Sequence, residues 1–150
     1  MSAGWEQDVE RIRAARPRHV LFLCVANSAR SQMAEGIARA RAPATVKIAS
    51  AGSQPSRLNR LAVQALAEVG IDISRQFSKG VDDIPPGDVD AVITLCAEEV
   101  CPVFFGNALR VHWALPDPAA VQGDEAARLE AFRRVRDELR RRLEVVFRPA

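Results

Sequence analysis

Apolar and polar positions follow one another along this chain in blocks that predict strands separated by helices. Short apolar runs predict strands over residues 20–25, 46–49, 90–96 and 109–113. Apolar residues at helical spacing predict helices over residues 31–42 and 61–69, and a long last helix that Asp124 caps. Pro43 and Gly70 stand where the first two helices should stop. The pattern therefore indicates a chain in which strands and helices alternate.

Such alternation is typical of an α/β fold, and we expect a doubly wound three-layer sandwich around a four-stranded parallel sheet. The run over residues 20–25 is apolar throughout, as expected for a central strand that is covered on both faces. Ligands of such sheets bind outside the carboxyl ends of the strands. Cys24 and Cys96 end the first and third predicted strands, and Asp117 follows the fourth. We therefore expect these three side chains on one rim.

Residues 1–18 precede the first strand and are predicted to form an extension ahead of a single domain of residues 19–150. Trp5, Val9 and Ile12 recur at helical spacing among charges, which predicts a short amphipathic helix. Arginines of this extension and of the last helix are expected to face water. They are Arg11, Arg13, Arg16, Arg18, Arg133, Arg134, Arg136 and Arg140 to Arg142.

Length and composition suit a single domain with one hydrophobic core. The chain has 150 residues, of which 48% are hydrophobic, and no apolar run is long enough to cross a bilayer. No secretory signal opens it, and a net charge of +2 is too small to imply nucleic acid. Three cysteines fit neither a disulfide framework nor a zinc site. We expect a cytoplasmic monomer without a metal, bound to neither nucleic acid nor membrane.

The segment after Cys24 reads C-x5-R-S between a strand and a helix start, which predicts an oxyanion loop. Inward-pointing N–H groups at such a turn can cradle a tetrahedral anion, and the guanidinium of Arg30 can hold two of its oxygens. The same groups favour Cys24 as a thiolate nucleophile, to which Ser31 can donate a hydrogen bond. The predicted loop consists of Val25, Ala26, Asn27, Ser28, Ala29, Arg30 and Ser31.

Three further residues suggest the chemistry that would come after nucleophilic attack. Asp117 lies between two prolines and can serve as a general acid for a leaving oxygen. Cys96 and Cys101 are separated by four residues, and one helical turn between them would bring their thiols close together. Because thiols supply electrons in pairs, Cys24, Cys96 and Cys101 form a candidate relay. A phosphatase would need only Cys24.

Taken together, these motifs resemble those of arsenate reductases built on the low-molecular-weight protein tyrosine phosphatase fold, the type usually coupled to thioredoxin. The resemblance is carried by residues 20–31, 50–52, 70–74, 92–96, 101–103 and 112–119. It implies that Cys24 attacks arsenate, that Arg30 holds it and that Asp117 is the acid. It further implies that Cys96 and Cys101 carry a disulfide cascade that releases arsenite. We expect no bound cofactor and an external thiol reductant, thioredoxin by preference, with glutathione and glutaredoxin, or mycothiol, as alternatives.

The sequence departs from this family near the loop. Some members bind a monovalent cation there, with an acidic residue after Gln-Thr-Ser, whereas this chain has Lys79 after Gln76-Phe77-Ser78. We predict that the Lys79 ammonium takes the place of the cation. The residues predicted to support the loop are Asn27, Ser31, Glu35, Ser50 and Lys79.

Two other functions stay open at this point. A low-molecular-weight tyrosine phosphatase needs an aromatic wall, yet Ala119 follows Pro118 and the chain has no tyrosine. Such an enzyme also has no use for Cys96 and Cys101, although weak activity on small aryl phosphates is compatible with the loop. A non-enzymatic oxyanion sensor would keep its ligand binding without Asp117, and a phosphocysteine carrier has little need for Arg30 or Asp117.

Overall fold

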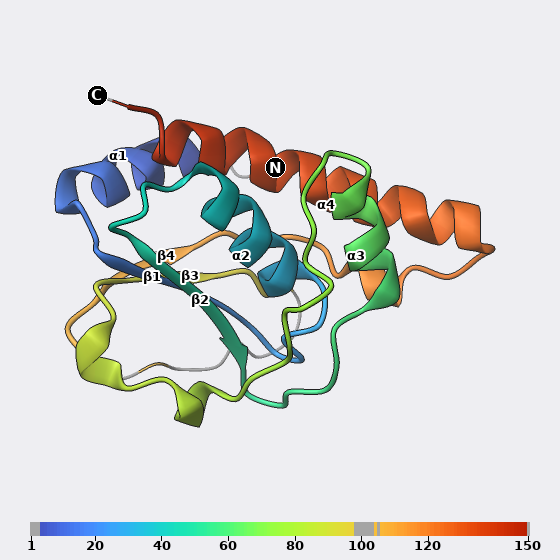
Figure 1. Cartoon of the computed structure of the whole chain (residues 1–150), viewed down its shortest axis with the longest axis horizontal. Coiled ribbons are helices and arrows are strands. Elements are labelled where there is room, and N and C mark those ends of the chain that lie inside the picture. The colour runs from blue at the N-terminus through green and yellow to red at the C-terminus, as the bar shows by residue number, and fades with distance from the viewer. Residues whose placement is uncertain (1–3, 98–103, 105, 150) are drawn as a thin grey trace.

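The computed structural model describes residues 4–97, 104 and 106–149. Its centre is a four-stranded, wholly parallel sheet with the order β2-β1-β3-β4, which confirms the predicted fold class (Figure 1). The strands are β1 (His19–Cys24), β2 (Lys47–Gly52), β3 (Ala91–Thr94) and β4 (Leu109–His112). The second strand runs through Gly52 rather than ending at Ala49, because it pairs with β1 as far as Cys24.

The helices are α1 (Trp5–Ala15), α2 (Arg30–Arg41), α3 (Arg60–Ala67) and α4 (Glu125–Val146). The 3-10 turns are η1 (Val81–Asp83), η2 (Pro86–Asp88) and η3 (Pro118–Ala120). Helices cover one face of the sheet, and the connectors that include the 3-10 turns η1 and η2 cover the other, whereas η3 lies against α4 (Figure 1). Among the described residues, no helix combines the length and apolar character that a membrane crossing requires.

Strand β1 is buried on both faces, as its continuous apolar run predicts. Val20 and Phe22 belong to the core beneath the helices, and Leu21 and Leu23 belong to a smaller core beneath the connectors. Alternate side chains of a strand point to opposite faces, so one apolar run serves both cores. This central position fixes the direction of the chain where it leaves the sheet at Cys24.

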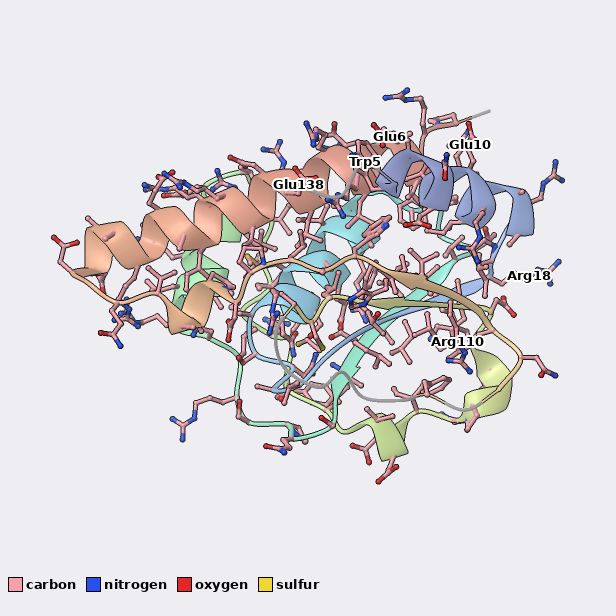
Figure 2. The ribbon with its side chains drawn as sticks, turned by 180° about the vertical axis from the view of Figure 1, so that it is seen from behind. Trp5, Glu6, Glu10, Arg18, Arg110 and Glu138 are labelled. Atoms are coloured by element: carbon pink, nitrogen blue, oxygen red, sulfur yellow. The ribbon has the colours of Figure 1, made fainter. Side chains whose placement is uncertain are left out.

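The helix predicted within residues 1–18 is present as α1. It lies against α4, with Trp5 near Glu138 in Figure 2, and it buries Val9 and Ile12 in the same core as Phe132. Arg13 does not simply face water, because its Nη1 donates to carbonyl oxygens at the C-terminal end of α4. The boundary between an extension and a domain of residues 19–150 stays a prediction.

The prediction that the arginines of the last helix face water is wrong for Arg136 and Arg142. Arg142 is 1% exposed, and its guanidinium lies 5.6 Å from the Trp5 ring and 5.4 Å from the Trp113 ring. Its Nε donates to Glu138 at 2.6 Å. Arg136 donates to the Ala65 carbonyl and to Glu68. Aromatic faces and paired carboxylates allow a guanidinium with a long apolar stem to be buried.

Candidate active site

The predicted oxyanion loop joins the end of a central strand to the start of a helix. Strand β1 ends at Cys24 and α2 begins at Arg30, so the loop lies at the carboxyl edge of the sheet. Cys24 and Arg30 are both buried, with exposed fractions of 3% and 4%. The side chains of the predicted nucleophile and the predicted cation are therefore both buried in the protein rather than exposed at its surface.

The loop turns its carbonyl groups outward. The acceptors Val25, Ala26 and Ser28 receive hydrogen bonds from the backbone N–H groups of Gln54, Ser56 and Asn59, at 2.9, 3.1 and 2.9 Å. Within the described part of the chain, no protein group accepts a hydrogen bond from the backbone N–H groups of residues 25–29. These donors remain for a bound anion, which is the arrangement that an oxyanion cradle requires.

Gly52, at the end of β2, lies directly against this loop. A Cβ atom at this position would come within 2.3 Å of the Val25 carbonyl oxygen and 2.9 Å of the Asn27 nitrogen. Both are backbone atoms and cannot rotate away. The close approach of β2 to the loop thus requires glycine.

Cys24 is joined to a chain of buried hydrogen bonds. Its Sγ lies 2.8 Å from Ser31 Oγ, and Asn27 Nδ2 donates to that oxygen at 2.8 Å. The serine hydroxyl can therefore accept from the amide while it shares a hydrogen bond with the sulfur, in which either atom could be the donor. Asn27 has a φ of 48°, a left-handed conformation that asparagine tolerates better than most residues.

Arg30 connects the loop to the ends of β3 and β4. Its Nη1 donates to the carbonyl oxygens of Leu95 at 3.3 Å and Leu115 at 3.0 Å. Its Nη2 lies 3.9 Å from Asp117 Oδ2, and Asp117 Oδ1 accepts from the Ala119 N–H at 3.0 Å. The structure therefore places the candidate acid beside the guanidinium that would hold the anion.

Two of the three predicted relay cysteines lie among the described residues, and their sulfur atoms differ in state. Cys24 is a free thiol. Cys96 follows β3, is 1% exposed and takes part in a disulfide. Cys101 and residues 98–100 of the helical turn predicted before it lie outside the described residues. The relay therefore stays a prediction.

Glu35 lies 2% exposed behind the loop and is surrounded by donors. Ser50 Oγ donates to it at 2.6 Å, Arg39 lies at 3.0 Å and the Lys79 ammonium at 3.5 Å. Asn27 Nδ2 donates in turn to Ser50 Oγ at 2.9 Å. The predicted supporting residues thus form one connected network beneath the loop.

Sequence reasoning missed Gln32 as part of this support. Its Nε2 lies 3.0 Å from both the carbonyl and the side-chain oxygen of Asn27, and 2.9 Å from the Phe77 carbonyl. Gln76 donates to Gln32 in turn. The one signal in the sequence was an amide placed directly after the C-x5-R-S motif, and only Asn27 among its partners is close in sequence, whereas Gln76 and Phe77 are distant along the chain.

Comparisons with known proteins agree with this geometry. The low molecular weight phosphotyrosine protein phosphatase family matches residues 19–148. An arsenate reductase of Bacillus subtilis (strain 168) is 45% identical over 126 residues, which cover 83% of this chain and 91% of that protein.

Two solved structures extend the comparison. One, described as an arsenate reductase in the phosphate binding state, has a TM-score of 0.71 at 35% identity, covering 85% of this chain and 94% of its own. A thioredoxin-dependent arsenate reductase of Corynebacterium glutamicum has a TM-score of 0.61 at 27% identity, and the match covers 95% of this chain and 72% of that protein. The chain belongs to the low molecular weight phosphotyrosine protein phosphatase family, in which its relatives include these arsenate reductases.

Proposed function

We propose that the protein is an arsenate reductase in which Cys24 attacks an arsenate held in the oxyanion loop. The observation that carries this proposal is the loop itself, with outward carbonyls, unused N–H groups and a buried Arg30 around a free thiol. The relatives named arsenate reductase support the choice of oxyanion.

In the first step, the Cys24 thiolate forms a bond to arsenic and one arsenate oxygen leaves as water. Asp117 supplies the proton for this oxygen, because its carboxyl lies beside Arg30, the side chain that would hold the anion. The loop N–H groups and Arg30 stabilise the charge on the remaining oxygens. Ser31 holds the sulfur as a thiolate before attack.

The second step starts from Cys96 reduced out of the disulfide that this structure holds. Its thiolate attacks Cys24 Sγ, and the electron pair of the sulfur–arsenic bond stays on arsenic. Arsenic is thereby reduced by two electrons and leaves as arsenite, while the two thiols are oxidised to a disulfide. Cys101 then attacks Cys96 and releases Cys24. An external dithiol returns two electrons, so that the cycle needs no bound cofactor.

Thioredoxin is the proposed electron donor, supported by the thioredoxin-dependent relative. Glutathione with glutaredoxin, or mycothiol, would instead act on the Cys24 adduct directly. Parallel turnover assays with arsenate and each donor system test this choice. Turnover with glutaredoxin alone, independent of Cys101, would contradict the relay.

Single-cysteine variants test the order of steps. We expect Cys24→Ser to abolish the reaction. Cys96→Ser should form the Cys24 adduct but release no arsenite, because the Cys24–Cys96 disulfide cannot form. Cys101→Ser should stop after about one turnover. Mass spectrometry of the stopped Cys101→Ser protein should find the Cys24–Cys96 disulfide. A parallel assay with an aryl phosphate as substrate distinguishes a reductase from a phosphatase, because phosphatase turnover would need only Cys24 and would survive in the other two variants.

A sensor or carrier would retain ligand binding without Asp117, and so would the proposed enzyme. The two differ in turnover: Asp117→Ala should bind phosphate normally yet reduce arsenate at least about 100-fold more slowly. Asp117→Asn is the matched control, because it keeps the cap to Ala119 and loses only the transferable proton. Unchanged arsenate turnover in both variants would refute the acid role.

We also propose that the Lys79 ammonium replaces a monovalent cation beneath the loop. The Lys79 backbone N–H donates to Asn27 Oδ1 at 2.8 Å, and its Nζ donates to the Phe77 carbonyl at 2.8 Å and lies 3.5 Å from Glu35. A second cation has no need to bind where an ammonium already neutralises the buried carboxylate. Potassium at constant ionic strength should leave the melting temperature and activity unchanged, whereas Lys79→Ala should become sensitive to it. A strong potassium effect on the unaltered protein would contradict the proposal.

A further inference from the structure

A groove at the amino edge of the sheet is lined by arginines and by apolar side chains. It is formed by the end of α1, the segment that joins α2 to β2, and the end of α4, and its volume is about 900 Å³. We call it the basic groove. Its arginines are Arg13, Arg16, Arg18, Arg41 and Arg148, and its apolar walls include Ile12, Pro17, Pro43, Val46, Val146 and Phe147.

The basic groove lies at the opposite edge of the sheet from Cys24. Arg18 and Val46 immediately precede β1 and β2, whereas Cys24 is the last residue of β1 (Arg18 is labelled in Figure 2). Because the strands run in parallel, the six residues of β1, about 20 Å of extended chain, separate the groove from the oxyanion loop. A ligand in the basic groove would therefore not compete with an anion in the loop.

The positive charge of the basic groove exceeds what the protein around it neutralises. The helices α1, α2 and α4 all end at the groove, and each C-terminus carries about half a negative charge. Arg13 serves this purpose, because its Nη1 donates to the carbonyl oxygens of residues 145, 146 and 148. Arg41 pairs with Glu144, and within the described part of the chain no carboxylate pairs with the other three arginines. Five guanidinium groups thus leave an excess of about two positive charges.

Apolar side chains between these arginines distinguish the groove from an ordinary solvated basic face. Ile12 and Val146 are buried in the hydrophobic core, and Phe147 is half-buried against it. Water next to such walls gains little, and its release by an apolar group is favourable. An inorganic anion would use only the arginines and an uncharged apolar molecule only the walls, whereas a molecule with both features would use the whole groove.

We propose that the basic groove is a binding site for small organic anions with an apolar body, such as aryl or alkyl carboxylates, sulfonates and phosphates. Its volume lies within the range of sites that take ligands of this size. Arg13, Arg16 and Arg18 precede residue 19, where the family match begins, so the N-terminal extension supplies much of the charge. A bound ligand would hold α1 and α4 together, and we therefore expect it to raise the melting temperature.

Fluorescence titration of the full-length, reduced protein with anilinonaphthalene sulfonate tests the site, with the uncharged phenylnaphthylamine in parallel. Arg16→Gln with Arg18→Gln, both at exposed positions, should weaken binding of the sulfonate about fivefold at low ionic strength. The same variant should change binding of phenylnaphthylamine by less than about twofold. Arg16→Lys with Arg18→Lys keeps the charge and should bind the sulfonate within about twofold of the unaltered protein.

Arg57→Gln with Arg75→Gln is the matched control, since it removes the same charge at exposed positions that do not line the basic groove. It should leave sulfonate binding unchanged. An equal loss in this control, or no loss without Arg16 and Arg18, would overturn the site.

Two further measurements locate the bound probe. Inorganic phosphate at constant ionic strength should not displace the sulfonate, and displacement would place the probe in the oxyanion loop and overturn the proposal. The sulfonate should raise the melting temperature, whereas a lowered value would mean that it binds the unfolded chain and would also overturn the proposal. Sulfonate binding as expected, in a protein that does not bind phosphate, would keep the basic groove and refute the proposed function of the loop.

Discussion

Gly52→Ala is the smallest substitution that should deform the oxyanion loop without removing any of its functional groups. The added Cβ would come within 2.3 Å of the Val25 carbonyl oxygen and 2.9 Å of the Asn27 nitrogen. Neither atom belongs to a side chain, so either β2 or the loop must move. Because β2 pairs with β1 through Gly52 itself, the loop is the part that should move.

The expected size of the effect can be worked out from this contact. Overpacking a well-packed site by one methyl group costs about 1–3 kcal/mol, which for a domain of this size lowers the melting temperature by roughly 2–12 °C. A displacement of about 1 Å in the groups that position a reacting ligand costs about 100-fold in turnover. We therefore expect a moderate loss of stability with a large loss of arsenate turnover and of phosphate affinity.

Two other glycines provide controls for the same chemical change. A Cβ on Gly36 would come within 2.4 Å of Ile73 Cγ2 and 3.0 Å of Leu66 Cδ1, which are side-chain atoms of the core. Gly36→Ala should therefore lose stability while keeping turnover per folded molecule. A Cβ on Gly87 would meet nothing within 4 Å, so Gly87→Ala should change neither property.

The assay combines thermal unfolding with steady-state arsenate reduction and phosphate titration of each variant. If Gly52→Ala folds and retains turnover within about threefold of the unaltered protein, the loop is not held by its contact with β2. If Gly36→Ala loses as much turnover as Gly52→Ala at equal stability, the loss reflects general destabilisation. Either result would refute the reasoning from the 2.3 Å approach.

Three further variants test other parts of the structure. Asn27→Ala should lower turnover at least about tenfold, measured by steady-state kinetics, because alanine in a left-handed conformation costs about 1–2 kcal/mol and the hydrogen bond to Ser31 is lost. The hydrogen bond from Arg133 lowers the pKa of Glu68 from 4.5 to about 2. The stabilisation that ionised Glu68 contributes is therefore complete above pH 4.5 and is lost as the pH falls toward 2. In urea unfolding, Glu68→Gln should therefore make the free energy of unfolding less dependent on pH between these two values. Arg142→Ala should lower the free energy of unfolding by about 3 kcal/mol in chemical denaturation, because it removes a buried cation and leaves Glu138 without its 2.6 Å partner.

The strand, loop and helix around Cys24 were predictable because all of their determinants are contiguous in the chain. An apolar run, a C-x5-R-S motif and a helical period follow one another over residues 20–42. The rim position of Asp117 was predictable as well, since parallel strands place their carboxyl ends on one edge. The full extent of β2 was not predictable, because the residues Ser50, Ala51 and Gly52 do not alternate between apolar and polar. They belong to the strand because they pair with β1.

Burial of polar side chains was the part that the sequence could not supply. Arg142 is buried only because Trp5 and Trp113, far away along the chain, place their rings around it. Gln32 is buried because Asn27 and the Phe77 carbonyl accept from it. The helical pattern assigned Arg142 to the solvent face and did not single out Gln32, since partners as far along the chain as Trp5 and Phe77 leave no periodic signal.

These long-range contacts also show why a C-x5-R motif does not define an oxyanion site by itself. The loop conformation is set by Gly52 from β2, by the N–H groups of the segment over residues 54–59 and by Gln32 from α2. Each contact acts on a backbone carbonyl or amide of the loop, so each controls where the N–H groups point. A chain with Cys24 and Arg30 but a larger residue in place of Gly52 would keep the nucleophile and the cation, yet lose the cradle between them. The glycine that ends the second strand is therefore as much a determinant of the site as the cysteine that ends the first.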